Sequence, residues 1–322
     1  MKIAVYSPNW VGDAALSLPF IHSVKEKYPN SEIIIICKEW VHSVYQNNPN
    51  IDKIMTILTK DSRGMLKTFQ LGFLLRKEDI KIFYTLTDSF RSAFVLWLSN
   101  SKKRIGYNVQ GRGVFLTNKI ELSTKKNHRS KKYLKLVGQD DFLSDDKLIY
   151  LKKDEINWAK QEIEKIGIES PVALFPFSVS DVRTFPNEKI SEWLGGSKEH
   201  YLIFGSKNDK EKALTIIKEN KNISITSICG TYSLRQSIVL ISICKYAIAA
   251  DSGLGHISSI IKVPTISFFG ANRSSVTKPL GSYCLVIDKS NRCNPCKKNI
   301  CCLNSINRAD VDSSINSLTL DL

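Results

Sequence analysis

The chain has 322 residues, of which 43% are hydrophobic and 24% charged, and its formal net charge at pH 7 is +15. This composition is typical of a globular protein, and the length suffices for two domains of ordinary size. No apolar run reaches the roughly 18 residues that a membrane-spanning helix needs, and the first residues lack the pattern of a secretory signal. We therefore expect a cytoplasmic protein without a membrane-spanning helix.

The first predicted strand covers residues 3–6, and the turn SPNWVGD follows it. Apolar residues at Ala14, Leu18, Ile21 and Val24 then have helical spacing. Asp13 lies between the strand and this predicted helix. It suits a helix N-cap, whose side chain accepts hydrogen bonds from backbone N–H groups. It also suits a ligand site, because ligands of open α/β sheets bind outside the carboxyl ends of the strands.

Two further strands are predicted in the first half, at residues 33–37 and 81–86, with helical patterns between and after them. A strongly basic stretch follows: from Ser101 to Lys135 there are eleven Lys or Arg residues and one acid, Glu121. Such a stretch can meet nucleic acid, an anionic membrane or a phosphorylated substrate, or it can face solvent. We expect no nucleic-acid partner, because no nucleic-acid-binding motif accompanies the charge.

The second half shows a clear alternation of short apolar strands and helices of about ten residues, which is typical of parallel βαβ units covered on both faces. The predicted strands are 172–176, 201–205, 223–229, 246–251 and 264–270, and the predicted helices are 155–167, 187–193, 209–219, 234–244 and 253–261. The polar stretch at 144–153 marks a domain boundary. The sequence thus predicts the α/β class, with two Rossmann-like parallel-sheet domains at residues 1–150 and 151–322. Neither a Walker A motif nor a G-x-G-x-x-G fingerprint occurs, which disfavours kinases and dehydrogenases.

The first loop of interest in the second half is FPFSVSDVRTFP, at residues 175–186. It carries the hydroxyls of Ser178 and Ser180 and the guanidinium of Arg183, and it leads into a predicted helix. Hydroxyls, a guanidinium and a helix N-terminus together suit phosphate binding. An ordinary polar surface loop is the alternative.

Two more strand ends carry acidic residues. Asp209, in FGSKNDKE, can accept from ribose hydroxyls or cap the helix that follows. In ADSGLGH, Asp251, Ser252 and Gly253 form a strand-to-helix turn, and His256 lies one helical turn later. The free N–H groups and the dipole of that helix favour a diphosphate. A Ser–His hydrolase is disfavoured, because no G-x-S-x-G elbow surrounds Ser252.

The cysteines form two groups. Four lie in apolar segments, where we expect small buried hydrophobic side chains: Cys37, Cys229, Cys244 and Cys284. Four more crowd into RCNPCKKNICC: Cys293, Cys296, Cys301 and Cys302. A disulfide framework is not expected in a reducing cytosol. The C-x2-C spacing allows zinc, although adjacent thiolates rarely both ligate one tetrahedral ion.

Several of these segments occur in one order that resembles a known family. SPNWVGDAALSLP, DVRTFP, FGSKND, ADSGLGHISSIIKVPTISFFG and CNPCKKNICC, together with RIGYNVQGRGVFLT, look like the ADP-heptose:lipopolysaccharide heptosyltransferases of glycosyltransferase family 9. The cysteine cluster is most similar to the heptosyltransferase II branch. The resemblance covers nearly the whole chain. It implies a GT-B fold, with two Rossmann-like domains facing a central cleft and the donor mainly in the second.

The resemblance also implies roles for single residues. The family's catalytic acid falls on Asp13, and its donor-binding D-[ST]-G-x-x-H motif falls on Asp251, Ser252, Gly253 and His256. A loop lysine of the family falls on Arg183, so a guanidinium fork replaces a point charge. The other donor-binding candidates are Ser178, Ser180 and Asp209. The candidate acceptor-binding residues are Asn9, Trp10, Gly12, Lys102, Arg104 and Lys131.

We thus expect an inverting glycosyltransferase that moves heptose from ADP-L-glycero-D-manno-heptose to the inner core of lipopolysaccharide, as the second heptose on the first. The expected partners are ADP-heptose, a phosphorylated lipid A–Kdo–heptose acceptor and the anionic inner face of the inner membrane, where the protein acts peripherally in outer-membrane biogenesis. No cofactor or obligatory metal and a monomeric state are expected, with the cysteine cluster as a structural segment. A family member with another sugar or acceptor, like heptosyltransferases I and III, and a non-catalytic nucleotide-binding relative remain as alternatives.

Overall fold

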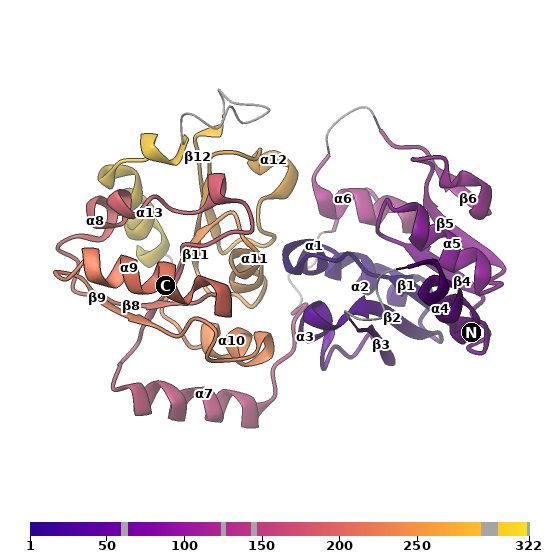
Figure 1. The fold of residues 1–322 in the computed structure, drawn as a ribbon, viewed down its shortest axis with the longest axis horizontal. Helices are drawn as coiled ribbons and strands as arrows, with labels where there is room; N and C mark the ends of the chain where they lie inside the picture. The colour runs from indigo at the N-terminus through magenta and orange to yellow at the C-terminus, as the bar shows by residue number, and fades with distance from the viewer. Residues whose placement is uncertain (59–63, 124–126, 143–146, 291–301, 321–322) are drawn as a thin grey trace. The chain divides into compact units, whose positions relative to one another are not determined.

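The computed structural model describes residues 1–58, 64–123, 127–142, 147–290 and 302–320 (Figure 1). The chain divides into two compact units, Met1–Tyr150 and Leu151–Leu322. Each unit contains a six-stranded sheet in which all neighbouring strands are parallel. No helix of the described ranges combines the length and the apolar character that crossing a bilayer requires.

The sheet of the first unit has the strand order β3-β2-β1-β4-β5-β6. The strands are β1 (Lys2–Tyr6), β2 (Glu32–Lys38), β3 (Lys53–Ile57), β4 (Ile82–Thr85), β5 (Lys103–Tyr107) and β6 (Asn118–Ile120). The central strand β1 pairs with β2 on one side and β4 on the other, with Val5 opposite both Ile35 and Tyr84. The chain changes direction across the sheet between β1 and β4, and ligands of open α/β sheets bind at such a switch point.

Helices cover both faces of this sheet. They are α1 (Val11–Leu16), α2 (Leu18–Lys27), α3 (His42–Tyr45), α4 (Met65–Arg76), α5 (Phe90–Leu98) and α6 (Arg129–Leu134), with the 3-10 turns η1 (Glu39–Val41), η3 (Arg112–Phe115) and η4 (Lys135–Val137). Leu75 of α4 and Leu96 of α5 pack with Phe83 of β4 in one buried cluster. Phe20 of α2 contacts Tyr84 of the same strand edge-to-face, with ring centroids 5.2 Å apart.

The single helix predicted from Ala14 to Val24 is instead two helices, which meet at Ser17. Pro19 lies in the first turn of α2 and has no N–H to continue the hydrogen-bond ladder of α1. The Ser17 hydroxyl donates to the Ala14 carbonyl at 2.7 Å and thereby closes the end of α1. Apolar spacing alone could not show this break, because both helices bury their apolar residues.

The sheet of the second unit has the strand order β12-β11-β10-β7-β8-β9. Its strands are β7 (Val172–Phe175), β8 (His200–Ile203), β9 (Ser224–Ser227), β10 (Ala247–Ala250), β11 (Thr265–Phe269) and β12 (Cys284–Asp288). Its helices are α7 (Lys153–Ile166), α8 (Asn187–Leu194), α9 (Lys210–Glu219), α10 (Leu234–Ile241), α11 (Gly253–Ile260), α12 (Ser274–Thr277) and α13 (Arg308–Leu320), with 3-10 turns η5 (Asp181–Arg183), η6 (Lys207–Asp209) and η8 (Cys302–Ser305). The strands and helices predicted here are present, with ends that differ by a few residues.

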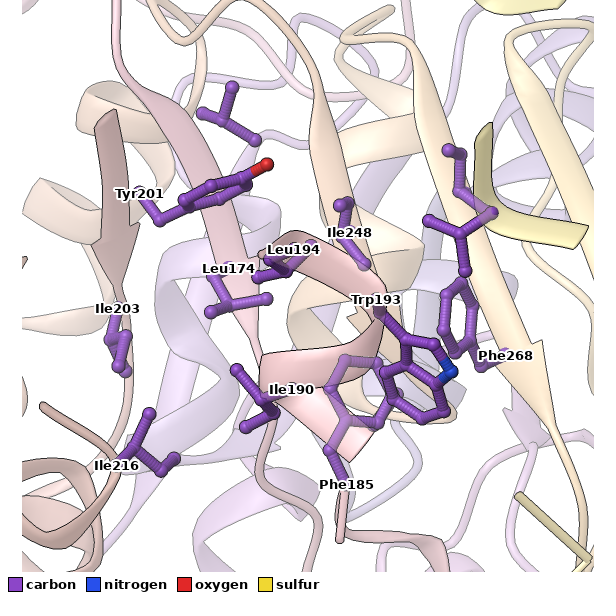
Figure 2. Close-up of a cluster of buried hydrophobic side chains, with 14 of the residues drawn as sticks. Leu174, Phe185, Ile190, Trp193, Leu194, Tyr201, Ile203, Ile216, Ile248 and Phe268 are labelled. Atoms are coloured by element: carbon purple, nitrogen blue, oxygen red, sulfur yellow. The ribbon is translucent and has the colours of Figure 1, made fainter. Parts of the chain in front are cut away.

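An aromatic cluster in the second unit ties its core to a functional loop (Figure 2). The rings of Phe185, Trp193 and Phe268 contact one another, with centroid distances of 5.0 to 5.2 Å. The Trp193 indole N–H donates to the Ile306 carbonyl at 3.0 Å, so this buried polar group is paired. Phe185 belongs to the loop after β7. The core therefore fixes the end of the loop that carries Arg183.

The junction between the units is short. The side chain of Asn48 donates to the carbonyl of Leu148 at 3.1 Å, and both Leu148 and Ile149 are buried. Just after the junction, Leu151 packs against a hydrophobic cluster of the second unit. The Lys152 N–H then donates to the Glu155 carboxylate at 2.8 Å and starts α7.

Three of the cysteines expected in apolar segments are buried: Cys37, Cys229 and Cys244. The fourth, Cys284, is half-buried. Burial raises the pKa of Cys37, Cys244 and Cys284 to about 12 and that of Cys229 to about 11. These thiols are protonated at neutral pH and pack as small hydrophobic groups. Of the cysteine cluster, Cys293, Cys296 and Cys301 lie outside the described residues, and Cys302 begins η8.

Candidate functional site

Asp13 lies in the first turn of α1, directly after the turn that ends β1. The N-cap of α1 is Trp10, which has an extended backbone, so the predicted N-cap role of Asp13 is wrong. A carboxylate in the first turn of a helix is still favoured by the helix dipole. The Asp13 side chain is partly accessible, with 22% of it exposed.

A cation lies beside this carboxylate. Arg129, the first residue of α6, places Nε 3.7 Å from Asp13 Oδ1. Burial acts to lower the pKa of Arg129, but the charge of Asp13 and contacts with Tyr133 outweigh it, so the pKa is raised. Burial, with Asp13 adding to it, holds the pKa of Tyr133 well above its usual value. Asp13 thus faces a permanent cation and a neutral phenol from one helix.

A buried tyrosine fixes the backbone around Asp13. The Tyr45 hydroxyl lies 2.7 Å from the Ser7 hydroxyl and 3.0 Å from the Ser17 hydroxyl. Ser7 follows β1 and Ser17 ends α1, so one phenol holds both ends of the segment that carries Asp13. Burial raises the pKa of Tyr45, which keeps this group protonated.

Three predicted acceptor residues precede Asp13 in the turn after β1. Asn9 and Trp10 are exposed, and Gly12 is half-buried. The Asn9 carbonyl accepts a 2.7 Å hydrogen bond from the indole N–H of Trp40. Two partly exposed indoles, those of Trp10 and Trp40, therefore belong to this surface.

A second acid, Asp88, follows β4 and was not predicted from the sequence. Its carboxylate lies 2.5 Å from Lys132 Nζ and 3.5 Å from Arg112 Nη2. Arg112 is fully buried and donates to the carbonyls of Tyr107, at 2.9 Å, and Thr87. Burial lowers the pKa of Arg112, and the charge of Asp88 opposes that shift. The carboxyl ends of β1 and β4 thus carry an acid each, and each acid is paired with a base from the predicted basic stretch.

The other predicted basic residues have different surroundings. Lys102 is exposed, and Lys131 forms a 2.6 Å ion pair with Asp141. Arg104 donates to the carbonyls of Phe115 and Ser101 at 2.7 Å each, so its guanidinium holds the backbone around β5. Lys125 and Lys126, which belong to the same stretch, lie outside the described residues.

In the second unit, the structure brings two of the predicted loops together at Asp251. This residue follows β10, and only 4% of it is exposed. Its Oδ2 accepts from Arg183 Nη1 at 3.3 Å and from Asn272 Nδ2 at 2.6 Å. Its carbonyl accepts from the Ser178 hydroxyl at 3.1 Å. Asn272 was not predicted, because no motif connects it with the loop after β7.

The loop after β7 is closed by its own hydrogen bonds. The Phe185 N–H donates to the Pro176 carbonyl at 2.8 Å, and the Ser178 N–H donates to the Thr184 hydroxyl at 3.1 Å. Ser180 precedes η5, and its carbonyl accepts from the Arg183 N–H at 2.9 Å. Arg183 is therefore presented on a closed loop, with a quarter of its side chain exposed, at 25%.

The N-terminus of α11 follows Asp251 directly. Ser252 is its N-cap residue, yet its side chain makes no capping hydrogen bond, and its buried hydroxyl has no partner among the described residues. Gly255 lets the helix approach β10, because a Cβ there would lie 2.9 Å from the Ala249 Cβ. His256 is buried one turn into the helix. A helix N-terminus without a side-chain cap attracts anions through its dipole and N–H groups.

Asp209 has a local role. Its Oδ2 accepts from the N–H of Ser206 at 2.7 Å and from the Ser206 hydroxyl at 2.6 Å. It therefore stabilises the turn η6, and its side chain does not cap α9. Its predicted contact with the donor stays a prediction.

Comparison with known proteins decides the family. Residues 68–307 match the family model described as glycosyltransferase family 9 (heptosyltransferase). The chain belongs to glycosyltransferase family 9. The match includes Arg183 and the segment from Asp251 to His256, whereas Asp13 lies before it.

Individual relatives match this family 9 glycosyltransferase over most of its length. It is 26% identical to lipooligosaccharide heptosyltransferase 2 of Haemophilus ducreyi over 312 residues, which cover 89% of this chain and 88% of that protein. The structure of Escherichia coli ADP-heptose lipopolysaccharide heptosyltransferase II matches with a TM-score of 0.82 at 20% identity, covering 100% of this chain and 99% of the other. The E. coli heptosyltransferase WaaC, solved with ADP, matches with a TM-score of 0.73 at 13% identity, over 99% and 100% of the two chains. The family 9 glycosyltransferase therefore has the two-domain GT-B fold.

Proposed function

We propose that this family 9 glycosyltransferase is an inverting heptosyltransferase that adds the second heptose to the first in the lipopolysaccharide inner core, with ADP-L-glycero-D-manno-heptose as donor. The likeness to proteins named heptosyltransferase 2 supports the choice of sugar and acceptor. The observation that carries the proposal is the convergence of Arg183 and the N-terminus of α11 at the buried Asp251. That arrangement suits the diphosphate of a nucleotide sugar.

The second unit, residues 151–322, is assigned the donor. Arg183 and the first turn of α11 bind the diphosphate, with the hydroxyls of Ser178, Ser180 and Ser252 and the ring of His256 around it. Oδ2 of Asp251 is engaged by Arg183 and Asn272, so we assign Oδ1 to a hydroxyl of the donor sugar. A solved relative that holds ADP supports the nucleotide.

The first unit, residues 1–150, is assigned the acceptor and the base. Asp13 accepts the proton of the acceptor hydroxyl while that oxygen forms a bond to the anomeric carbon. The bond between the anomeric carbon and ADP breaks on the opposite face, which inverts the configuration. The electron pair leaves with ADP, and Arg183 stabilises the charge that develops there. Arg129 orients the carboxylate of Asp13. The proposal assigns no step to a metal ion or cofactor.

The acceptor in this proposal is a phosphorylated lipid A–Kdo–heptose. Its phosphates face cations of the basic stretch such as Lys102 and Lys131, and its sugars contact the turn that holds Trp10. Because this acceptor is a lipid, we place the protein peripherally at the anionic inner face of the inner membrane. We also propose that it acts as a monomer.

The test is transfer by purified protein. ADP-heptose is incubated with core acceptors that carry no heptose, one heptose or two, and the products are analysed by mass spectrometry. We expect a gain of one heptose with the one-heptose acceptor alone, and NMR of the new linkage reports inversion. Transfer to a different acceptor would contradict the assignment to the second heptose. Absence of transfer to all three would contradict the proposal as a whole.

A further inference from the structure

The helix α4 of the first unit is apolar on two sides. Its inner side packs through Thr68, Gly72 and Leu75, which are buried. Its outer side exposes five large apolar side chains: Met65, Leu66, Phe69, Phe73 and Leu74. Leu66 is 70% exposed and Phe73 50% exposed. A helix on the surface of a soluble domain normally has polar residues on its outer side.

The packing of Gly72 fixes which side of α4 faces outward. A Cβ at this position would lie 2.3 Å from the Cβ of Leu98 in α5. Only glycine allows this approach of the two helices, so rotation of α4 about its axis would bring a side chain into Leu98. The exposed apolar side is therefore built into the fold.

Aromatic side chains continue the apolar surface from α4 over α5 to η3. Phe69 of α4 contacts Phe94 of α5, with ring centroids 5.3 Å apart. Phe94 stacks on Trp97 and contacts Phe115 of η3, at 5.7 and 5.2 Å. Trp97 is 48% exposed. One continuous surface thus presents phenyl, indole and aliphatic groups, and we call it the α4–α5 surface.

The segments that carry the α4–α5 surface contain cations and no acids. Residues 64–77 and 89–120, which include α4, α5 and η3, contain no Asp or Glu. Their exposed or half-buried cations are Lys67, Arg76, Lys77, Arg91, Lys102, Lys103, Arg104 and Lys119. The guanidinium of Arg76 lies over the Phe73 ring, 6.0 Å from its centroid. The acids that follow α4 are neutralised, since Glu78 pairs with Lys53 at 2.7 Å and Asp79 with Lys81 at 2.8 Å.

We propose that the α4–α5 surface docks on an anionic phospholipid bilayer, with its aromatic and aliphatic side chains in the headgroup region and the surrounding Lys and Arg residues on lipid phosphates. Apolar side chains bordered by cations are the composition of interfacial membrane-binding segments. Each cation near an anionic leaflet adds an electrostatic attraction, and salt weakens this attraction by screening. A second copy of this chain is disfavoured as occupant, because two such surfaces would bring like charges together. The inference rests on the proposed function only in that a lipid-bound acceptor requires access to a membrane.

The first experiment measures binding of the purified full chain to vesicles without lipopolysaccharide or any sugar acceptor. Vesicles of phosphatidylglycerol and phosphatidylethanolamine are compared with phosphatidylcholine vesicles by flotation, at low and high ionic strength. We expect binding to the anionic vesicles that weakens with salt, and little binding to phosphatidylcholine. Absence of binding to anionic vesicles, or equal binding to both compositions, contradicts the proposal.

Matched variants locate the contact. The double substitution Leu66→Ser with Phe73→Ser should weaken partitioning about tenfold or more, because two apolar side chains no longer enter the lipid. Leu214→Ser, at an exposed leucine of α9, is the control for an exposed apolar group in the other unit. Arg76→Gln with Lys77→Gln should weaken binding at low salt, and Lys218→Gln with Lys221→Gln should not. Equal partitioning of the α4 variants and their controls would overturn the assignment.

Lipid contact is also read from fluorescence. Lipids brominated near the top of their acyl chains quench tryptophans that reach the boundary between headgroups and chains. We expect much of this quenching to disappear in Trp97→Phe and to persist in Trp158→Phe. Unchanged quenching in Trp97→Phe contradicts the proposed orientation. The two proposals fail separately: vesicle binding without heptose transfer refutes the proposed function alone, and transfer to a soluble acceptor without vesicle binding refutes the docking surface alone.

Discussion

At the scale of single residues, the ion pair between Asp13 and Arg129 leads to a prediction about the Asp13 carboxylate. Asp13→Asn should lower kcat at least about a hundredfold, because an amide cannot accept the proton of the acceptor hydroxyl. The fold should persist, since Trp10 and not Asp13 is the N-cap and a partly exposed ion pair contributes at most about 1 kcal/mol. Initial rates of transfer and thermal unfolding together check this.

The control for this variant is Asp141→Asn. It removes a carboxylate from another ion pair of the same unit, that with Lys131, and should leave kcat unchanged. If Asp13→Asn turns over at nearly the rate of the wild type, the carboxylate is not the base and only orients Arg129.

The position of Arg183 leads to a prediction about donor binding and transfer. Arg183→Ala should raise the barrier to transfer by roughly 2–4 kcal/mol and weaken ADP binding, because the guanidinium contacts the leaving group as its charge grows. Arg183→Lys should recover part of the loss, since it restores the charge without the two-pronged geometry. Calorimetric titration with ADP and steady-state kinetics measure both effects.

Lys218→Ala removes an exposed cation of the same unit and is the matched control. Unchanged ADP affinity and unchanged kinetics in Arg183→Ala would show that the loop after β7 does not hold the diphosphate. Asp251 keeps its hydrogen bond from Asn272 in that variant, so the turn should remain folded.

At the scale of elements, the pairing of α7 with α10 makes a prediction about pH. Arg235 donates two hydrogen bonds of 2.7 Å to Glu155, and these lower the pKa of that carboxyl group. The stabilisation is therefore complete above the unfolded-state pKa of about 4.3 and is lost as the pH falls through the lower folded-state value. Glu155→Gln should reduce the free energy of unfolding by about 1–3 kcal/mol at pH 7 and flatten its decline in acid.

Denaturant unfolding across a pH series measures this effect. Glu164→Gln, at an exposed position of the same helix, is the control and should change neither the stability nor the pH dependence. Parallel pH profiles of wild type and Glu155→Gln would mean that the pair with Arg235 contributes nothing to stability.

Whether an element could be predicted from the sequence depended on its amino-acid composition. Five strands of the second half, all but β12, were predictable because buried parallel strands have near-continuous apolar runs. β5 and β6 were not, since KRIGY and NKI carry lysines and an arginine within the basic stretch. Sequence motifs indicated Asp13 and Asp251. Their partners Arg129 and Asn272 come from distant segments, and only the packed fold brings such residues together.

At the scale of the whole molecule, the two units have separate cores and separate assigned ligands. ADP alone should therefore slow hydrogen exchange in the second unit, around the loop after β7 and the first turn of α11, because binding stabilises the elements that contact the ligand. The core strands of the first unit should exchange at their unliganded rates. Mass spectrometry of peptides from both units measures this, and protection confined to the first unit would reverse the assignment of donor and acceptor.

The short junction between the units sets how they can move. Ile149 is buried in the first unit, and Leu151 packs in the second, so the chain passes from one core to the other within a few bonds around Tyr150. Any reorientation of one unit against the other must be taken up by a handful of backbone torsions there. The connection is thus a short linker, and its stiffness depends on the local backbone at Tyr150. Glycines inserted at this point would loosen the tether without touching either core.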